Sequence, residues 1–376
     1  MRFLITGFYF DGFHGSVMHI LEIAKGLSNN GHNVTIVSQI VKNGVKKQLV
    51  QGSNITVLSV SEVNTQMHFD FALCYHFPVL PSIVSKGVTI DKIMFGCLSG
   101  FAPIELLPKI AAKNVFYIQS HSEELATQLV SEHHLSSEKI LVVPNCVSDN
   151  YFRNYNYQPN ASLKSVAIVS NHVPQEIREA IKHLKTKGIK CTVYGEEDRY
   201  IPISPEILIK YDCIISIGKT VQYALALGIP IFEYDRFGGS GYITKDNVEQ
   251  EENFNFSGRA TKRIIEGVSI ADELVNGYES IKKDLIYLKS YAIKYKVSSE
   301  ISKYYGNCKY YLPFDCNDEE LYSFTKEQFS FFYDSICKFK SFPYKLGKSM
   351  LFIASHIIPR RTQNKIKKHF LADEQL

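Results

Sequence analysis

Short apolar runs alternate with longer amphipathic stretches over the first half of the chain. Residues 3–5 predict a buried strand that runs into a glycine turn at Gly7, and residues 17–27 place apolar side chains at helical spacing. Gly31 ends that helix, and residues 34–37 predict the next strand. Further strands are predicted by the apolar runs at 55–58, 71–74, 93–95, 115–118 and 140–143. Strands alternating with helices predict βαβ units and a parallel sheet covered on both faces.

The same alternation restarts after a polar stretch rich in Tyr and Asn at 149–161, which we predict to be a linker. The elements expected beyond it are strands at 166–169, 191–194 and 213–217 and helices at 174–187, 270–274 and 280–295. The expected fold class is therefore α/β, with two doubly wound, Rossmann-like domains at 1–150 and 151–310 and an interdomain cleft between their strand ends. A helical, basic C-terminal tail is expected at 311–376.

One segment joins a strand, a glycine and a helix in direct succession. Gly218 follows the apolar strand 213–217, Thr220 can begin a helix, and Gly228 ends it. A helix N-terminus just past the carboxyl end of a parallel strand binds anions, because unpaired N–H groups and the helix dipole point there. Lys219 adds a full positive charge at the same place. We therefore predict a site for a phosphorylated ligand.

A second glycine-rich turn is predicted downstream, at Gly238, Gly239 and Gly241. Glycine lets backbone approach a ligand closely, which would make this turn a loop for the ligand's phosphates or sugar. The alternative is a plain turn.

Composition narrows the class of partner and the compartment. Of the 376 residues, 45% are apolar, which is enough to form two hydrophobic cores. The formal net charge of +4 is mild and does not indicate nucleic-acid binding, which normally needs a concentrated basic face. The eight cysteines are scattered, so reduced and buried thiols are expected. No Asp/His cluster has metal-ligand spacing, so neither a metal nor another cofactor is expected. The first strand is too short for a signal peptide, and no apolar run approaches the roughly 20 residues of a membrane span. A cytoplasmic protein is expected.

Several segments in the right order resemble the GT-B glycosyltransferases, especially the large retaining family that builds bacterial surface polysaccharides. They are residues 12–27 with 31–37, the interdomain segment 142–147, and the segment 224–230 that ends in Gly-Ile-Pro. Residues 219–223, 234–242 and 255–259 also resemble a subgroup of O-antigen and capsule synthesis. The resemblance covers roughly residues 1–300. It implies a nucleoside-diphosphate sugar as donor, no catalytic metal, and retention of the anomeric configuration.

One departure from the family concerns its two glutamates, which are separated by seven residues. The second, which contacts the donor ribose, falls on Tyr223, and the first, which contacts the sugar, falls on Ile215. Both carboxylates are therefore absent, and the donor is expected to be held differently. Glu249, Glu251 or Glu252 from the following loop could substitute for them. Impaired catalysis is the alternative.

Two residues are expected to be catalytic. Because a departing nucleoside diphosphate develops negative charge, cations and N–H groups must stabilise it where no metal does. Lys219 suits this role, with the Thr220 hydroxyl as a further donor; the alternative is a solvated lysine. His121 follows a predicted strand, where the family places a histidine near the donor sugar; the alternative is an exposed residue at a helix start.

Other residues are expected to contact the substrates. Those on the donor side are Gly12, Gly15, Asn171, His172, Tyr223, Gly238, Gly239 and Arg259, and those on the acceptor side are His14 and His76. The glycines give backbone access to the transferred group, and Arg259, expected to start a helix, is a second cation for an anion. Surface or turn residues without a function are the alternative for these positions.

The last part of the chain differs from the rest. Lysines and arginines between 338 and 368 interleave with Phe, Leu, Ile and Met, which suits an interfacial helix on anionic lipid. The alternative is a closing helix with a solvated basic face. The function expected is transfer of a sugar from a nucleotide-sugar to a lipid-linked oligosaccharide, at the inner face of the plasma membrane. The alternatives are a non-catalytic sugar-nucleotide or glycan-binding subunit of an assembly complex, and a sugar-nucleotide epimerase of the same fold.

Overall fold

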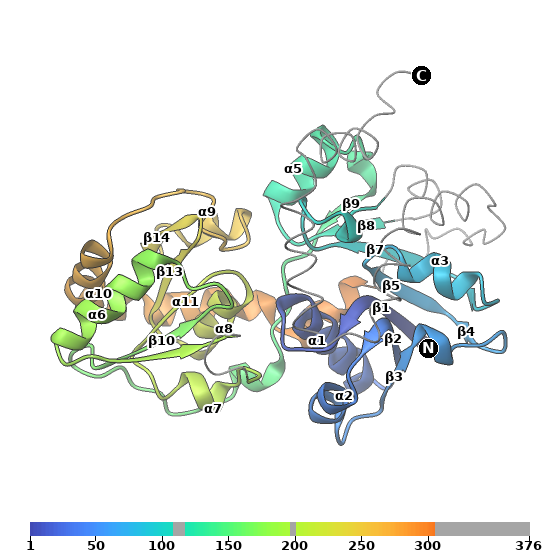
Figure 1. Cartoon of the computed structure of the whole chain (residues 1–376), viewed down its shortest axis with the longest axis horizontal. Helices are drawn as coiled ribbons and strands as arrows, with labels where there is room; N and C mark the ends of the chain where they lie inside the picture. The colour runs from blue at the N-terminus through green and yellow to red at the C-terminus, as the bar shows by residue number, and fades with distance from the viewer. Residues whose placement is uncertain (108–116, 196–200, 305–376) are drawn as a thin grey trace, which may run out of the picture.

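The computed structural model describes residues 1–107, 117–195 and 201–304. Figure 1 shows two α/β units side by side, the first in blue to green and the second in green to yellow. Each unit is a sheet with helices on both faces, which confirms the predicted fold class of two Rossmann-like domains. The predicted tail at 311–376 lies outside the described residues.

The first unit is built on a seven-stranded parallel sheet with the order β3-β2-β1-β5-β7-β8-β9. Its strands are β1 (Arg2–Phe10), β2 (Asn33–Val41), β3 (Ile55–Ser59), β5 (Phe71–Tyr75), β7 (Ile93–Cys97), β8 (Tyr117–Ser120) and β9 (Ile140–Val142). Its helices are α1 (Gly15–Asn29), α2 (Asn43–Val50), α3 (Val79–Val84) and α5 (Glu123–Ser131). Two short strands, β4 (His68–Phe69) and β6 (Thr89–Ile90), pair separately. The predicted strands of this half are therefore present.

The expected turn at Gly7 was wrong, because β1 continues through it to Phe10. A Cβ at position 7 would lie 2.6 Å from the Ile20 Cδ1 atom of α1. Glycine therefore lets the helix pack closely on the strand, and it does not turn the chain.

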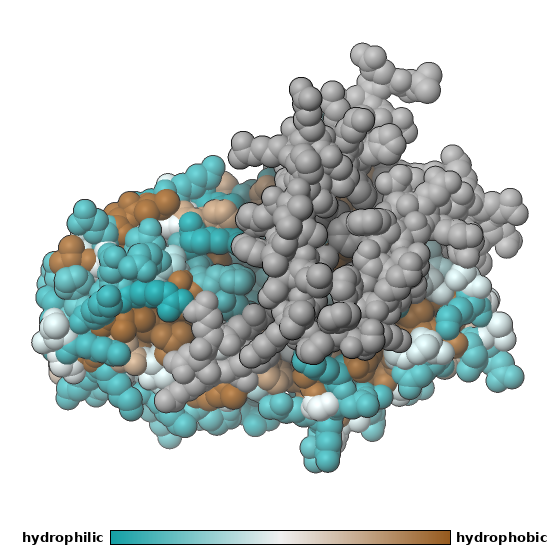
Figure 2. Space-filling view, viewed as in Figure 1, coloured by the Kyte–Doolittle hydropathy of each residue, from teal (hydrophilic) through white to brown (hydrophobic). Residues whose placement is uncertain are grey.

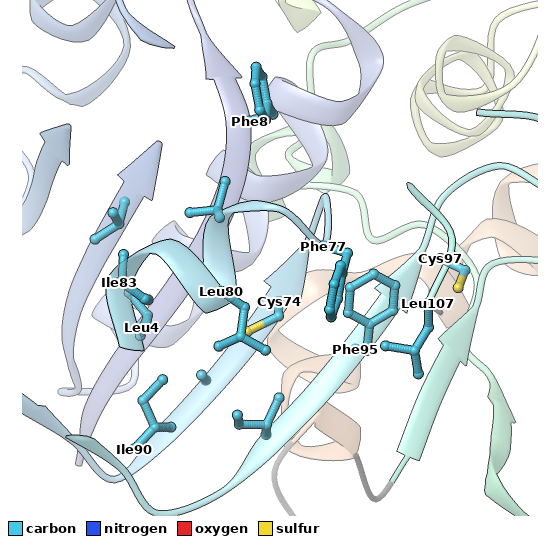
Figure 3. Packing of buried hydrophobic residues seen from close by; sticks show 14 of the residues in the cluster. Leu4, Phe8, Cys74, Phe77, Leu80, Ile83, Ile90, Phe95, Cys97 and Leu107 are labelled. Atoms are coloured by element: carbon cyan, nitrogen blue, oxygen red, sulfur yellow. The ribbon is translucent and has the colours of Figure 1, made fainter. Parts of the chain in front are cut away.

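Side chains that alternate along each strand fill two cores, one on each face of this sheet. Leu4 and Cys74 belong to the core under α3 and α5, whereas Phe3 and Leu73 face α1. Figure 3 shows the α3 side, where the Phe77 and Phe95 rings, 6.2 Å apart, meet between helix and sheet. Burial of such side chains contributes about 1.5–3 kcal/mol each to folding.

The second unit holds a five-stranded sheet with the order β11-β10-β12-β13-β14. Its strands are β10 (Ser165–Val169), β11 (Lys190–Tyr194), β12 (Cys213–Ser216), β13 (Ile231–Asp235) and the antiparallel β14 (Gly238–Tyr242). Its helices are α6 (Gln175–Thr186), α7 (Pro205–Leu208), α8 (Lys219–Leu227), α9 (Val248–Asn253), α10 (Gly267–Ile281) and α11 (Leu285–Tyr291). The strand order reverses between β10 and β12, and this switch point is where doubly wound sheets bind ligands.

Two local expectations in this unit were wrong. Gly238, Gly239 and Gly241 lie in the edge strand β14 and not in a turn. A Cβ at Gly239 would lie 1.9 Å from the Glu233 carbonyl oxygen, so the missing side chains let β14 approach β13. Arg259 lies in a turn and starts no helix; α10 begins at Gly267.

The chain returns to the first unit after α11. Through η6 (Ala292–Tyr295) it reaches α12 (Val297–Glu300) and η7 (Ile301–Tyr304), which pack on α1. Val297 and Ile301 are buried in the α1 core, and a Cβ at Gly26 would lie 2.7 Å from Val297 Cγ2. Val147 and Lys296 form a bridge beside this crossing. The two units are therefore joined by two chain segments, one at 143–164 and one near 296.

The described surface is mixed in polarity. Figure 2 shows brown, apolar residues in separate groups among teal ones on the visible part of the second unit. None of the helices described is both long and apolar enough to cross a bilayer. The described cysteines are free; Cys74, Cys97, Cys146 and Cys213 are buried, and Cys191 is half-buried. Burial raises the pKa of the Cys74 and Cys97 thiols to about 12. The predicted burial of the cysteines is confirmed at Cys74, Cys97, Cys146 and Cys213. The remaining three cysteines, 308, 316 and 337, lie outside the described residues.

Candidate functional site

A cavity of about 350 Å³ lies between the two units, at the carboxyl ends of the second sheet. The first unit contributes Phe13, Gly15 and Met18 at the start of α1. The second contributes residues at the carboxyl ends of its parallel strands and just beyond them. They are 169–172 at β10, Tyr194 and Gly195 at β11, 216–217 with Lys219, Thr220 and Tyr223 at β12, and Asp235 and Arg236 at β13. Ile201 and Ile203 complete the lining. The cavity therefore occupies the switch point that the strand order defines.

The N-terminus of α8 opens onto this cavity. Gly218 precedes the helix with φ of 61°, a conformation that favours glycine, and its N–H donates to the Phe256 carbonyl at 2.6 Å. Lys219 begins the helix, one residue earlier than the predicted Thr220, and Gly228 ends it in the left-handed region as predicted. The Val221 N–H donates to the Gly218 carbonyl oxygen at 2.9 Å. The N–H groups of Lys219 and Thr220 precede this first helical bond, and with the helix dipole they provide positive potential at the cavity wall.

The Lys219 ammonium is held by groups of the first unit and of the connecting segment 143–164. It forms an ion pair with the Glu22 carboxylate of α1 and donates a hydrogen bond to the Cys146 carbonyl oxygen. The Tyr223 hydroxyl donates to the other Glu22 oxygen at 2.9 Å. The Tyr223 ring in turn stacks on Tyr151 with centroids 4.2 Å apart. Glu22 thus joins two cavity residues of the second unit from across the junction.

The two positions of the family glutamates serve packing here. Ile215 is buried in the core of the second unit, with 1% of its surface exposed, and the Tyr223 hydroxyl donates its hydrogen bond to Glu22. The suggested substitutes lie elsewhere, because Glu249, Glu251 and Glu252 are all outside the cavity lining. Glu252 accepts hydrogen bonds from Tyr291 and Tyr295, both at 2.6 Å, and Glu251 is fully buried.

Arg236 is a cation of the cavity that the sequence analysis did not single out. Arg236 follows β13 directly and lies at the same carboxyl end of the parallel strands as Asn171 and Lys219. Its position after a predicted strand could therefore have identified it as a candidate. Its guanidinium lies 4.7 Å from the Phe237 ring centroid, while its backbone N–H donates to Asp235 at 2.7 Å. Burial raises the pKa of Asp235, a cavity residue as well, above its ordinary value.

The loop after β10 carries the predicted donor residues Asn171 and His172, and both line the cavity. Ser170 orients this loop, since its hydroxyl accepts from the His172 N–H at 3.0 Å. Gly195, directly after β11, lets this loop pack closely, because a Cβ there would lie 1.9 Å from the Ser170 carbonyl oxygen. The structure brings both residues to the cavity, and their contacts with a donor stay predictions.

The predicted residues of the first unit are spread more widely. Gly15 lines the cavity, and a Cβ there would meet no atom within 4 Å. Gly12 is buried in the preceding loop, and the His14 ring nitrogen Nε2 lies 2.8 Å from Asp11 Oδ1. His76 is 2% exposed: its Nδ1 accepts from the Phe8 N–H at 2.7 Å, and its Nε2 faces Glu105. Gly12, His14 and His76 lie outside the cavity lining, and their roles stay predictions.

His121 is buried at the end of β8 and does not line the cavity. Burial lowers the pKa of His121 to about 4, so the imidazole is neutral near physiological pH. The alternative of an exposed residue was wrong, because His121 is only 7% exposed. The next residue, Ser122, caps α5 and accepts from the Leu125 N–H at 3.2 Å. The catalytic role of His121 stays a prediction.

Three further residues predicted to contact the donor are Arg259, Gly238 and Gly239. Arg259 forms an ion pair with Glu124 of α5, with Nε 2.8 Å from Oε1, and thus joins the second unit to the first. Gly238 and Gly239 are buried in β14. None of the three lines the cavity, and a donor contact for them stays a prediction.

His19 is a buried polar residue of α1 that the sequence analysis missed. The single hydroxyl hydrogen of Tyr75 goes to Gln119 Oε1 at 2.9 Å, so this hydroxyl accepts from His19 Nε2 at 3.1 Å. Burial, and then the charge of Lys219, lower the pKa of His19 well below its ordinary value. A neutral histidine of fixed tautomer therefore lies beside the Glu22–Lys219 pair.

Among the described residues, His68, Asp70 and Asp91 bring three metal-ligating side chains within 4.8 Å of one another. The sequence spacing did not predict this group. It is partly exposed near the short strands β4 and β6, away from the cavity lining, and Asp70 accepts from the Arg2 N–H at 2.7 Å.

No protein-family model matches the sequence, and a comparison with curated proteins finds no match. Solved structures do match. A glycosyltransferase from Rickettsia africae ESF-5 has a TM-score of 0.53 at 14% identity, covering 82% of this chain and 99% of that one. Anabaena Alr3699/HepE, solved in complex with UDP and glucose, has a TM-score of 0.57 at 11% identity, covering 82% and 100%. The fold is GT-B.

GT-B proteins include enzymes of more than one reaction type. A Listeria monocytogenes protein named as a UDP-N-acetylglucosamine 2-epimerase matches with a TM-score of 0.52 at 10% identity, over 82% of this chain and 96% of that one. At these identities the likeness concerns the fold, so the activity has to be argued from the cavity and its residues.

Proposed function

We propose that the protein is a glycosyltransferase that moves a sugar from a nucleoside-diphosphate donor to a glycan acceptor. The observation that carries this proposal is the cavity between the units, where the α8 N-terminus, Lys219 and Arg236 meet at the strand ends of the second sheet. Backbone N–H groups and two cations in one wall suit a diphosphate. The complex of Anabaena HepE with UDP and glucose supports the assignment of the ligand class.

In this proposal the second unit stabilises the leaving diphosphate. Negative charge develops on the departing oxygen, and fixed N–H dipoles with Arg236, Lys219 and the Thr220 hydroxyl offset it without a metal. Asn171 and His172 would contact the donor from the β10 loop, and the backbone at Gly15 would face the transferred sugar. Retention of the anomeric configuration is proposed on the family resemblance alone.

The acceptor is proposed to be a lipid-linked oligosaccharide of surface polysaccharide synthesis, such as O-antigen or capsule. The first unit would hold it, and the basic, aromatic tail at 311–376 would contact anionic lipid at the inner face of the plasma membrane. This part of the proposal rests on the sequence, since the tail lies outside the described residues.

Two other functions have a specific observation in their favour. The epimerase among the matching folds favours conversion of a sugar nucleotide without an acceptor. Ile215 and Tyr223, which replace the family carboxylates, favour a non-catalytic binding subunit. Donor turnover separates the three: transfer or hydrolysis supports the transferase, an epimerised nucleotide-sugar supports the epimerase, and binding without turnover supports the subunit.

The first test is a thermal-shift screen of the purified protein against UDP, GDP, CDP and dTDP. A ligand that binds only the folded state raises the melting temperature with its concentration. Arg236→Gln should remove this shift while the exposed Arg153→Gln, outside the cavity lining, keeps it. Lys219→Ala is a poorer first probe because it leaves the buried Glu22 carboxylate unpaired. No shift with any nucleotide, or an equal shift in Arg236→Gln, would refute the donor site.

A further inference from the structure

Glu22 is a buried carboxylate whose two oxygens are both committed across the junction of the units. One oxygen pairs with Lys219 and the other accepts from the Tyr223 hydroxyl at 2.9 Å. The side chains of Glu22 and Lys219 are only 5% and 10% exposed. Lys219 and Tyr223 line the cavity, whereas Glu22 lies behind them. The carboxylate therefore reaches the donor wall from outside the cavity.

The pairing changes what a ligand in the cavity meets. A carboxylate and a phosphate offer an ammonium the same partner, a negatively charged oxygen within hydrogen-bond distance. With Glu22 in contact, the positive charge of Lys219 is balanced by a carboxylate, and its other described contacts are the Cys146 carbonyl oxygen and the Tyr223 ring, whose centroid lies 5.7 Å away. A phosphate that binds Lys219 must therefore replace an oxygen that is already there.

We propose that Glu22 competes with the donor diphosphate for Lys219 and thereby determines how strongly the site distinguishes a diphosphate from a nucleoside. The inference rests on the proposed donor site. A phosphate arriving at the α8 N-terminus takes the ammonium, while Glu22 keeps the Tyr223 hydroxyl. The competition weakens only ligands that reach Lys219, so a nucleoside without phosphate binds independently of it.

A second ion pair across the junction provides a matched control. Arg259 and Glu124 also join the second unit to the first, with side chains 20% and 14% exposed. Arg259 does not line the cavity. Glu124→Gln therefore loosens the junction by one ion pair without freeing a cation in the donor wall.

The test is isothermal titration of wild type, Glu22→Gln and Glu124→Gln with UDP and uridine, GDP and guanosine, CDP and cytidine, and dTDP and thymidine. Glu22→Gln keeps the side-chain size and a hydrogen-bond acceptor for Tyr223 but removes the charge. We expect it to strengthen binding of the preferred diphosphate about tenfold and to leave its nucleoside unchanged. Glu124→Gln should leave both unchanged.

Several outcomes would overturn the inference. Weaker or unchanged diphosphate binding in Glu22→Gln would mean that Glu22 positions Lys219 or is inert. Equal gains in Glu22→Gln and Glu124→Gln would make junction loosening the cause. If no pair binds to wild type or to any variant, the donor site itself fails, which is a different result from binding that ignores Glu22.

The unpaired Lys219 could prevent Glu22→Gln from folding, so a second variant keeps the charge. Glu22→Asp retains the carboxylate but shortens its reach by one methylene, which weakens its hold on Lys219. We expect a gain of about threefold for the diphosphate and none for the nucleoside. A loss of diphosphate affinity in Glu22→Asp would overturn the proposal.

Discussion

Replacing Glu251 with glutamine should remove a pH dependence from the stability of the second unit. Glu251 of α9 is fully buried and lies against Glu233 of β13, which is also fully buried. Glu233 accepts from the Gly258 N–H at 2.8 Å and from the Ser240 hydroxyl at 2.7 Å. Burial first, and then the charge and hydrogen bonding of Glu233, raise the pKa of Glu251 from 4.5 to about 8. At neutral pH Glu251 therefore keeps its proton.

The size of the effect follows from the two pKa values. The folded state holds this proton more tightly than the unfolded chain, so its contribution to stability is complete below pH 4.5 and is lost as the pH rises to about 8. Between these limits one proton changes the free energy of unfolding by about 1.4 kcal/mol per pH unit. From about pH 5.5 to about pH 7.5 the wild type should lose about 2.5 kcal/mol from this group, and Glu251→Gln none.

Urea unfolding followed by circular dichroism at several pH values measures this difference. Subtracting the variant from the wild type removes titrations that the two share. Glu249→Gln, on the exposed side of the same helix, is the control and should keep the wild-type slope. Parallel stability profiles for wild type and Glu251→Gln across this range would show that Glu251 is ionised when buried, and would refute the reasoning.

Two further changes test a loop of the candidate site and the N-terminal cap of α5. Gly195→Ala places a Cβ 1.9 Å from the Ser170 carbonyl oxygen, so it should displace the β10 loop and weaken nucleotide binding by about tenfold or more in titration calorimetry. Gly44→Ala, where a Cβ meets nothing within 4 Å, is its control; similar affinities for the two variants would contradict this account. Ser122→Ala removes the cap that accepts from the Leu125 N–H and should cost about 1 kcal/mol in urea unfolding. An unchanged midpoint would mean that water replaces the cap.

Local pattern predicted the parts of the fold that local physics determines. Gly218 and Gly228 both have positive φ, and their positions bracket α8 almost to the residue. The same residue type misled at Gly7 and Gly239, where the missing Cβ permits close packing of a helix or a strand. Composition cannot separate these two uses of glycine, because the distinction depends on a neighbour that is distant in sequence.

The pattern of apolar residues did not predict that the chain returns to the first unit after α11. Residues 280–295 fit one continuous helix, but α11 gives way to η6 and the chain crosses back at Lys296. Val297 and Ile301 then bury their side chains against α1. Their short apolar pattern is equally compatible with packing on the second unit, and only the tertiary arrangement decides between the two.

Comparison of motifs could not predict the contact of Glu22 with Lys219 and Tyr223, because the carboxylate comes from another part of the chain. Tyr223 stands where the family has a glutamate, and the sequence alone records this as the loss of a charge. In the fold a carboxylate nevertheless lies beside Tyr223. Glu22 is not part of the motif, but from α1 it contacts both Lys219 and Tyr223, and it is 201 positions away from Tyr223 in the sequence. The helix pattern of 17–27 identified the face that packs on the sheet, yet α1 buries His19 and Glu22 as well, since its other side faces the second unit. A charge supplied across a junction exists at the site only while the two units are together. Its effect on a ligand is therefore tied to the relative position of the units, which a glutamate within the motif would not be.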